Sequence, residues 1–140
     1  ESLEILRRYG HDIAAVLVET IQSRRPDLEP VEFLKELRTI TRETETALVF
    51  DEVVTGFRAA LGGNQERFGI RADLVTYGKI LGGGFPVGCY GGHKDLMDLV
   101  APMGPVYQAG TLSANPVGMC AGLATLNSQI LSIAGSVPSW

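Results

Sequence analysis

Two apolar runs of strand length, separated by an amphipathic segment, constrain the fold of this chain more than any other feature. IAAVLVE covers residues 13–19, and ALVFDE covers residues 47–52. Continuous apolar runs of this length are typical of strands buried on both faces. Pro30 opens a helix between them, whose apolar side chains share one face: Phe33, Leu34, Leu37 and Ile40. This order predicts an α/β fold with three layers, in which crossover helices cover a mostly parallel sheet.

Shorter segments continue this pattern along the chain. Residues 2–9 are expected to form a helix that ends at Gly10. DLVTY at residues 73–77 and VGCYGG at residues 87–92 are expected to form the third and fourth strands. KDLMDLVA, which follows at residues 94–101, predicts a short helix.

The most apolar late stretch, residues 117–134, carries polar side chains near its middle: Asn127, Ser128 and Gln129. It therefore predicts a buried helix and not a membrane-spanning one. Gly118 and Gly122 are four residues apart in this helix, which predicts that it packs closely against a neighbouring element.

Composition and charge narrow the classes of function. With 140 residues and 45% hydrophobic content, the chain has the size and composition of about one soluble domain. Its net charge of −4 and pI near 5.1 argue against a nucleic-acid partner, which requires a basic surface. Cys89 and Cys120 are far apart and form no CxxC pair, so no metal site is expected. Two thiols and no signal peptide fit a reducing cytoplasm.

Two side chains of opposite charge stand at the carboxyl ends of predicted strands. Asp51 lies at the end of the second apolar run, and Lys79 follows the third strand, ahead of three glycines. Ligands of parallel sheets bind outside the carboxyl ends of the strands, so both side chains are expected to face one crevice. A lysine amine can form a Schiff base with a carbonyl, and pyridoxal phosphate uses such a lysine together with an acid at its ring nitrogen.

A cofactor of this kind also needs a site for its phosphate. GTLSANP at residues 110–116 offers the hydroxyl groups of Thr111 and Ser113 and free N–H groups at a helix start. Structural explanations stay open for the two charged residues, because an aspartate at a strand end is often a turn former or helix cap. Lysines flanked by glycines are also common in solvated loops.

Three segments together resemble a known family: LVFDEVVTGFR at residues 48–58, the stretch from GGNQERFG to VGCYGG at residues 62–92, and GPVYQAGTLSANPVGMCAG at residues 104–122. They are similar to the class III, fold-type I, pyridoxal-phosphate aminotransferases. Within this family the chain is most similar to the glutamate-1-semialdehyde 2,1-aminomutases. The similarity covers roughly residues 13–126. It implies that residues 1–140 form the central part of the cofactor-binding large domain, without the N-terminal phosphate loop and the C-terminal small domain.

The resemblance implies roles for individual residues. Lys79 carries the cofactor as a Schiff base and moves protons between substrate carbons, while Asp51 pairs with the pyridine nitrogen. Val53 packs on the face of the ring. Thr111 reaches the cofactor phosphate of a neighbouring subunit, so the site is shared across a homodimer. The rest of the first segment's motif positions the loop: Glu52, Thr55 and Gly56.

The function that the resemblance implies is the conversion of glutamate-1-semialdehyde, a small amino aldehyde, to 5-aminolevulinate in tetrapyrrole synthesis. Residues 16–30 depart from the aminomutase pattern, with Thr20 where the family usually has proline. They are more similar to aminotransferase domains of polyketide and non-ribosomal peptide assembly lines. An aminotransferase acting on a carrier-bound or small aldehyde or ketone is therefore one alternative. A non-catalytic piece is another, and the isolated segment is expected to be inactive even where its parent is an enzyme.

Overall fold

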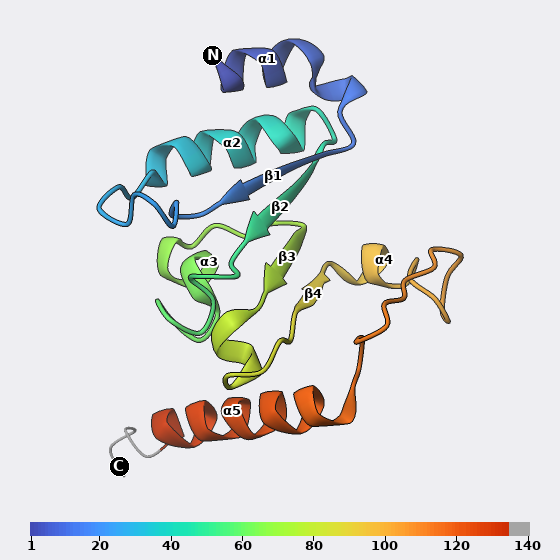
Figure 1. The fold of residues 1–140 in the computed structure, drawn as a ribbon. Coiled ribbons are helices and arrows are strands. Elements are labelled where there is room, and N and C mark those ends of the chain that lie inside the picture. Colours follow the sequence, from blue (N-terminus) through green and yellow to red (C-terminus); the bar gives the residue numbers. More distant parts are fainter. Residues whose placement is uncertain (135–140) are drawn as a thin grey trace.

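The computed structural model describes residues 1–134, with side chains described as far as Gln129. A four-stranded sheet runs through the middle of the molecule in the order β1-β2-β3-β4 (Figure 1). The strands are β1 (Ala15–Glu19), β2 (Ala47–Asp51), β3 (Leu74–Tyr77) and β4 (Cys89–Gly92). The first three are parallel to one another, and β4 is antiparallel to β3. The predicted α/β fold with a mostly parallel sheet is confirmed.

The reversal of direction at β4 follows from the connection that leads to it. A parallel neighbour of β3 needs a long crossover, usually one that contains a helix, whereas an antiparallel neighbour needs only a short return. Between β3 and β4 the chain forms only the 3-10 helix η2 (Lys79–Gly82) and a turn. The strand predicted at residues 87–92 begins two residues later, at Cys89.

One face of the sheet is covered by α2 (Val31–Glu43), which lies beside β1 and β2 together with α1 (Ser2–Tyr9) (Figure 1). Three of the four side chains predicted on the apolar face of α2 are buried, and the fourth, Phe33, lies at its margin and is 36% exposed. The core consists of side chains from these helices, from the strands and from the segment before β3: Leu6, Leu34, Leu37, Ile40, Leu48, Phe50, Ile70 and Val75.

An ion pair fastens α2 to the start of β3. Arg38, which is buried, donates from Nη1 to Asp73 Oδ2 at 2.8 Å. The same carboxylate oxygen accepts the backbone N–H of Leu48 at 2.7 Å. Asp73 thus links the crossover helix, β2 and β3 at the amino end of the sheet.

The opposite face of β1 is open, which corrects the prediction that its strand is buried on both faces. Successive side chains of a strand point to opposite faces. Val16 and Val18 pack against the core, but Leu17 points the other way and is 65% exposed. The apolar run therefore includes side chains on both faces of β1, and the described residues 1–134 leave one of these faces uncovered.

The predicted helix over residues 2–9 is found, and α1 ends at Gly10 as expected. Gly10 keeps a right-handed conformation, with φ −56°, and continues into the 3-10 helix η1 (Gly10–Asp12). A Cβ atom placed on it would lie 2.5 Å from the Thr44 side chain. Close packing against the end of α2, and not a left-handed turn, explains the glycine.

The helix α5 (Pro116–Ala134) lies on the other side of the sheet from α2 (Figure 1). Its two glycines face the segment that follows β3. A Cβ atom on Gly118 would lie 2.8 Å from Val87 Cγ2, and one on Gly122 would lie 3.2 Å from the Leu81 carbonyl oxygen. The predicted close packing at this glycine pair is confirmed.

The expected burial of this helix is not found over residues 116–129, the part whose side chains are described, because many of its apolar side chains there are exposed. Its side chains on the outer faces are exposed: Val117, Met119 and Leu123. Within the described residues, no helix is long and apolar enough to span a membrane.

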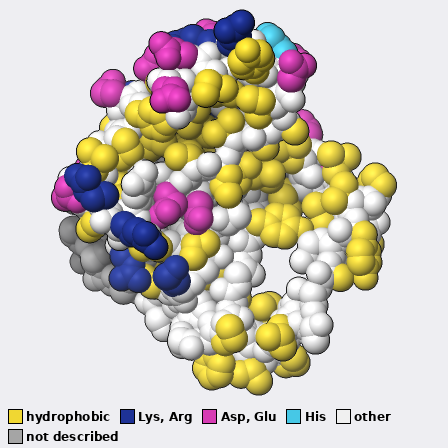
Figure 2. All heavy atoms as spheres, turned by 45° about the horizontal axis from the view of Figure 1, so that its top comes forward, with side chains coloured by type: hydrophobic (Ala, Val, Ile, Leu, Met, Phe, Trp, Pro, Cys, Tyr) yellow, Lys and Arg dark blue, Asp and Glu magenta, His cyan; other side chains and the backbone are white. Residues whose placement is uncertain are grey.

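The chain between α4 (Lys94–Met97) and α5 forms an extended arm, residues 99–115, that runs away from the sheet before it returns (Figure 1). In the space-filling view this part of the molecule stands apart from the body across an open gap (Figure 2). Hydrophobic side chains cover much of its surface there. Thr111 lies on this arm.

Candidate active site at the carboxyl edge of the sheet

Asp51 and Lys79 lie at the same edge of the sheet. Asp51 is the last residue of β2 and pairs in register with Thr76 of β3. Lys79 begins η2, two residues after β3 ends. Because β2 and β3 are parallel neighbours, both residues occur where these strands end. The expected placement at adjacent carboxyl ends is confirmed.

The Asp51 carboxylate is partly buried and shapes the loop that follows it. Its Oδ1 accepts the backbone N–H of Val53 at 2.9 Å, which turns the chain sharply after β2. This contact is the turn-forming use of aspartate that the sequence left open. It occupies one carboxylate oxygen, and Oδ2 makes no hydrogen bond to the described part of the chain.

Lys79 has a backbone conformation that is uncommon for a residue with a side chain. Its φ is 47°, in the left-handed region that few residues other than glycine adopt. Such conformations cost about 1–3 kcal/mol and concentrate at functional sites. The side chain is exposed, and its ammonium group makes no hydrogen bond or ion pair with the side chains that the structure describes, those of residues 1–129, or with the backbone of residues 1–134. No partner among these residues fixes its position.

Val53 lies beside the backbone that leads into Lys79. A Cβ atom placed on Gly78 would lie 3.3 Å from Val53 Cγ1, so the glycine lets this side chain approach the strand end. Val53 also lines a pocket of about 550 Å³ together with residues from β3, β4, the arm and α5: Thr76, Tyr77, Gly88, Cys89, Tyr90, Gln108, Ser113, Ala114 and Met119. Asp51 and Lys79 lie outside this lining.

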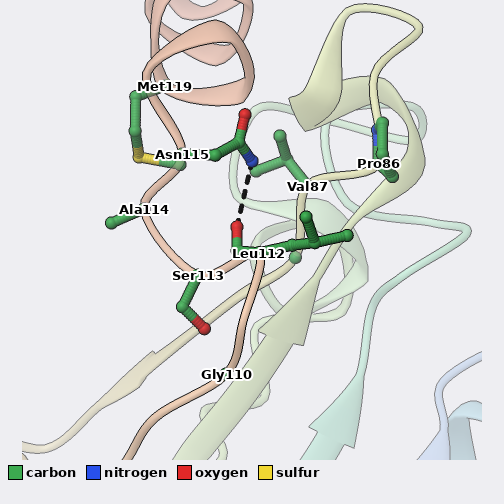
Figure 3. Close-up of a pocket in the computed structure, with 9 residues that line it drawn as sticks. Pro86, Val87, Gly110, Leu112, Ser113, Ala114, Asn115 and Met119 are labelled. Carbon is green, nitrogen blue, oxygen red and sulfur yellow. Dashed lines mark hydrogen bonds between the residues drawn. The ribbon is translucent and has the colours of Figure 1, made fainter.

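A second pocket, of about 280 Å³, opens between the start of α5 and the turn before β4 (Figure 3). Asn115 organises it. Its Nδ2 donates to the Leu112 carbonyl oxygen at 3.0 Å, and its Oδ1 accepts the N–H of Gly118 at 2.8 Å. Ser113, Ala114 and Met119 line both pockets, so the two are neighbours.

Thr111 lies in the turn before α5 and is exposed. Neither of the two pockets includes it among its lining residues. Thr111, the residue expected at the cofactor phosphate, is therefore not part of the Val53 pocket of its own chain.

The loop after β2 is fixed by Glu52, which is fully buried. Its carboxylate accepts the hydroxyl of Thr55, the N–H of Asn64 at 2.9 Å and the N–H of Gln65 at 2.8 Å. The last two N–H groups belong to the first turn of α3 (Gly63–Phe68). Glu52 and Thr55 thus hold the loop, as their motif implied.

Sequence reasoning missed the residues that extend this network. The Thr20 hydroxyl lies 3.2 Å from that of Thr55 and accepts the Nδ2 group of Asn64 at 3.0 Å. Thr20 stood out in the sequence only as a residue where the family usually has proline. Its position directly after β1, at the same edge of the sheet, is the signal that could have placed it in this network. Asn64 gave no such signal, because its partner is distant in sequence.

Two titratable groups near the strand ends are perturbed by burial. Burial raises the pKa of Tyr77, whose hydroxyl oxygen accepts Gln65 Nε2 at 3.4 Å. Cys89 is exposed as a residue, but partial burial of its thiol likewise raises the pKa of that thiol, which lowers the fraction present as thiolate.

The family model for aminotransferase class III matches residues 1–131. The chain belongs to the class III aminotransferase family. It is 57% identical over 124 residues to the glutamate-1-semialdehyde 2,1-aminomutase of Bdellovibrio bacteriovorus, covering 88% of this chain and 29% of that protein. The corresponding protein of Acetivibrio thermocellus is 58% identical over 116 residues, 82% of this chain and 27% of that protein. The chain thus spans less than a third of the length of these relatives.

Solved structures of transaminases share the fold of this class III chain. An omega-transaminase from Sphaerobacter thermophilus matches with a TM-score of 0.83 and 37% identity, covering 91% of this chain and 30% of that one. A transaminase with PLP bound matches with a TM-score of 0.82 and 32% identity, covering 91% of this chain and 31% of that one. These matches confirm the expected fold-type I architecture.

Proposed function

We propose that the whole protein converts glutamate-1-semialdehyde to 5-aminolevulinate with pyridoxal phosphate as cofactor, as a step of tetrapyrrole synthesis in the cytoplasm. The observation that carries this proposal is the 57% identity to a glutamate-1-semialdehyde 2,1-aminomutase over 88% of the chain. The identity to the omega-transaminase of similar fold is lower, at 37%. This difference favours the aminomutase reaction over transfer to a second substrate.

The residues at the sheet edge fit this cofactor by their chemistry. Lys79 supplies an exposed amine with no competing partner among the described residues, on a backbone held in an uncommon conformation. Asp51 supplies a carboxylate with one oxygen free of hydrogen bonds to the described residues. Val53 supplies an apolar side chain against Gly78, the residue before Lys79. An amine, an acid and an apolar face are the groups that a pyridine aldehyde requires.

Each of these residues then has a defined task. Pyridoxal phosphate, when bound, supplies an electron sink for negative charge at a substrate carbon. Asp51 would offer its carboxylate to the ring nitrogen. Lys79 would hold the cofactor by its Nζ and would serve as general acid and base for proton transfer between two carbons of the substrate. Val53 would shield one face of the ring from water.

The proposal includes a homodimer in which Thr111 serves the neighbouring subunit. Thr111 is exposed in this chain, and apolar side chains beside it on the arm are exposed as well, among them Tyr107 and Leu112. A group of exposed apolar side chains on one segment is typical of a protein interface. A second copy that covers the arm would place the Thr111 hydroxyl at the cofactor phosphate of that copy.

The test uses the purified full-length protein and glutamate-1-semialdehyde without any amino donor. An aminomutase recycles the amino group of its own substrate, so steady formation of 5-aminolevulinate is expected. A Lys79→Ala variant is the control and is expected to lose about 10²–10⁴-fold in turnover, the usual contribution of a positioned acid–base group. Turnover that requires an added amino donor would contradict the aminomutase proposal and favour an aminotransferase.

A further inference from the structure

Glu52 is a charged side chain that the proposed chemistry does not use, yet its exposure is 0%. Burial of a carboxylate is costly unless hydrogen bonds compensate it. We propose that Glu52 is a positioning residue, whose carboxylate holds the ends of β2 and β3 in the relative placement that Asp51 and Lys79 need. This inference rests on the proposed function.

The first link is the carboxylate itself, which uses both of its oxygens. Oε2 accepts the Asn64 N–H and the Thr55 hydroxyl, and Oε1 accepts the Gln65 N–H. An ionised carboxylate is an acceptor only, so it matches three donors without conflict. Bonds of this kind are stronger than those between neutral groups.

The glycine next to this carboxylate shows how closely the site is built. Gly63 has φ 70°, and a Cβ atom on it would lie 2.5 Å from Glu52 Oε2. The chain turns into α3 directly against the carboxylate, which leaves no room for a side chain. Glu52 is thus both packed against and hydrogen-bonded to the start of α3.

The second link runs from this cluster to the end of β3. The Glu52 N–H donates to the Thr76 carbonyl oxygen at 3.0 Å, which joins the two strand ends directly. Gln65, held by Glu52, donates from its side chain to the Tyr77 hydroxyl at 3.4 Å and accepts the Ala72 N–H at 3.0 Å. Tyr77 is the last residue of β3, two positions before Lys79.

The third link is an aromatic contact that depends on the same loop. The Phe57 and Tyr77 ring centroids are 5.2 Å apart. A Cβ atom on Gly56 would lie 2.3 Å from Tyr77 Cδ1, so the loop passes directly against this ring. The loop that Glu52 and Thr55 hold is thus in contact with the residue that leads into Lys79.

A change at Glu52 is therefore expected to act through Asp51 and Lys79, not through contact with substrate. Replacing it by glutamine keeps the shape but turns one acceptor oxygen into an N–H donor that faces the donors already present. The strand ends would lose part of their constraint, and misplacement of catalytic groups by about 1 Å can cost 10²-fold in rate. We expect turnover to fall by about 10- to 100-fold with little change in KM.

The experiment compares Glu52→Gln with Glu66→Gln in the full-length holoenzyme. Glu66 is the matched control, because it is an exposed glutamate on α3, the helix whose first turn Glu52 holds. Among the described residues, its carboxylate accepts the Gly62 N–H alone. In each variant one measures kcat, KM and the pH midpoint of the absorbance change of the lysine-linked cofactor. Glu52→Gln is expected to move that midpoint by about half a unit or more, since the charges around the link change. Glu66→Gln is expected to leave it in place.

A readout that does not depend on the loaded enzyme is amide hydrogen exchange in the cofactor-free protein. Glu52→Gln is expected to speed exchange at Asn64 and Gln65, the two amides that the carboxylate holds, by about 10-fold or more. Should Glu52→Gln fail to fold, Thr55→Val removes a single donor from the same carboxylate and is expected to give a smaller shift in the same direction.

An unchanged absorbance midpoint and kcat in Glu52→Gln, with only a lower melting temperature, would overturn the inference, since that is the result of a purely structural residue. Failure of the proposed function gives a different result. In that case the wild-type protein itself would show no lysine-linked cofactor, and both ideas would fall together. A normal wild-type spectrum with an unchanged Glu52→Gln spectrum overturns the positioning role alone.

Discussion

Two regions of the molecule, the segment from α1 to β3 and the segment from the arm into α5, differ in how far their apolar side chains are buried. In the first region Leu34 of α2 and Leu48 and Phe50 of β2 are fully buried. In the second, Met103 is 79% exposed and Tyr107 is 83% exposed. The first region has a core of its own, whereas the second presents its apolar side chains to the outside.

This difference separates the part of the site that contacts within one chain hold in place from the part that they do not. The strand ends that carry Asp51 and Lys79 belong to the region with its own core, so their placement depends on contacts within the chain. The arm that carries Thr111 has apolar residues on its surface over a continuous segment: Leu99, Met103, Val106, Tyr107 and Leu112. Single exposed apolar residues are normal in proteins, but a group of them is typical of an interface.

The largest effect is expected for a change in the covered core. Phe50→Ala removes a ring that is fully buried between the sheet and α2, and should lower the free energy of unfolding by about 3–5 kcal/mol. Met103→Ala on the arm is the comparison, expected to change the unfolding free energy of dilute protein by no more than about 0.5 kcal/mol. Urea denaturation of both variants measures this. Equal losses would mean that the two regions do not differ in packing.

A smaller but more selective effect is expected at the arm. Tyr107→Asp places a charge on the exposed apolar surface and should weaken subunit association by about 2 kcal/mol or more, which is about a 30-fold rise in the dissociation constant. Sedimentation of the full-length protein measures the constant. Leu28→Asp, an equally drastic change at an exposed leucine in the loop after β1, is the control and should leave association unchanged. An unaffected Tyr107→Asp dimer would remove the arm from the proposed interface.

The parts of this comparison that were predictable from the sequence are those with a local pattern. The spacing of Leu34, Leu37 and Ile40 predicted α2 and its buried face, and both are found. The order of the strands predicted that Asp51 and Lys79 end neighbouring strands, because parallel connectivity fixes where carboxyl ends fall. The Gly118 and Gly122 pair predicted the close contact of α5.

The parts that were not predictable depend on contacts between distant residues. Whether Leu17 is covered depends on what lies over the second face of β1, which a run of apolar letters does not reveal. Gly10 is explained by Thr44 and Gly78 by Val53, and neither pair is close in sequence. The network around Glu52 is of the same kind, since Thr20 and Asn64 meet it from separate elements.

The smallest effect is expected at Tyr77, which lies in the region with its own core. Burial raises the pKa of Tyr77 above the ordinary value of 10.0. The folded state therefore keeps this proton at a pH where the unfolded chain releases it. The stability that this group contributes is complete below about pH 10 and is lost as the pH rises through the pKa of the folded state.

Tyr77→Phe should accordingly change stability by no more than about 1 kcal/mol near neutral pH, where it loses one long hydrogen bond. Between pH 9 and 11 the variant should lose less stability than the wild type does. Denaturation curves at these pH values measure the difference, and Tyr107→Phe on the arm is the control that should follow the wild type. Parallel losses in wild type and Tyr77→Phe would contradict the assignment of the raised pKa to this residue.

The most direct test of the whole account is to reduce the full-length holoenzyme with borohydride and map the modified peptide. Borohydride adds hydride to a carbon–nitrogen double bond and fixes the cofactor to its lysine. The account predicts one cofactor mass per subunit, on the peptide that contains Lys79. A label on Lys35 or Lys94, or no label on a protein that has bound the cofactor, would contradict it.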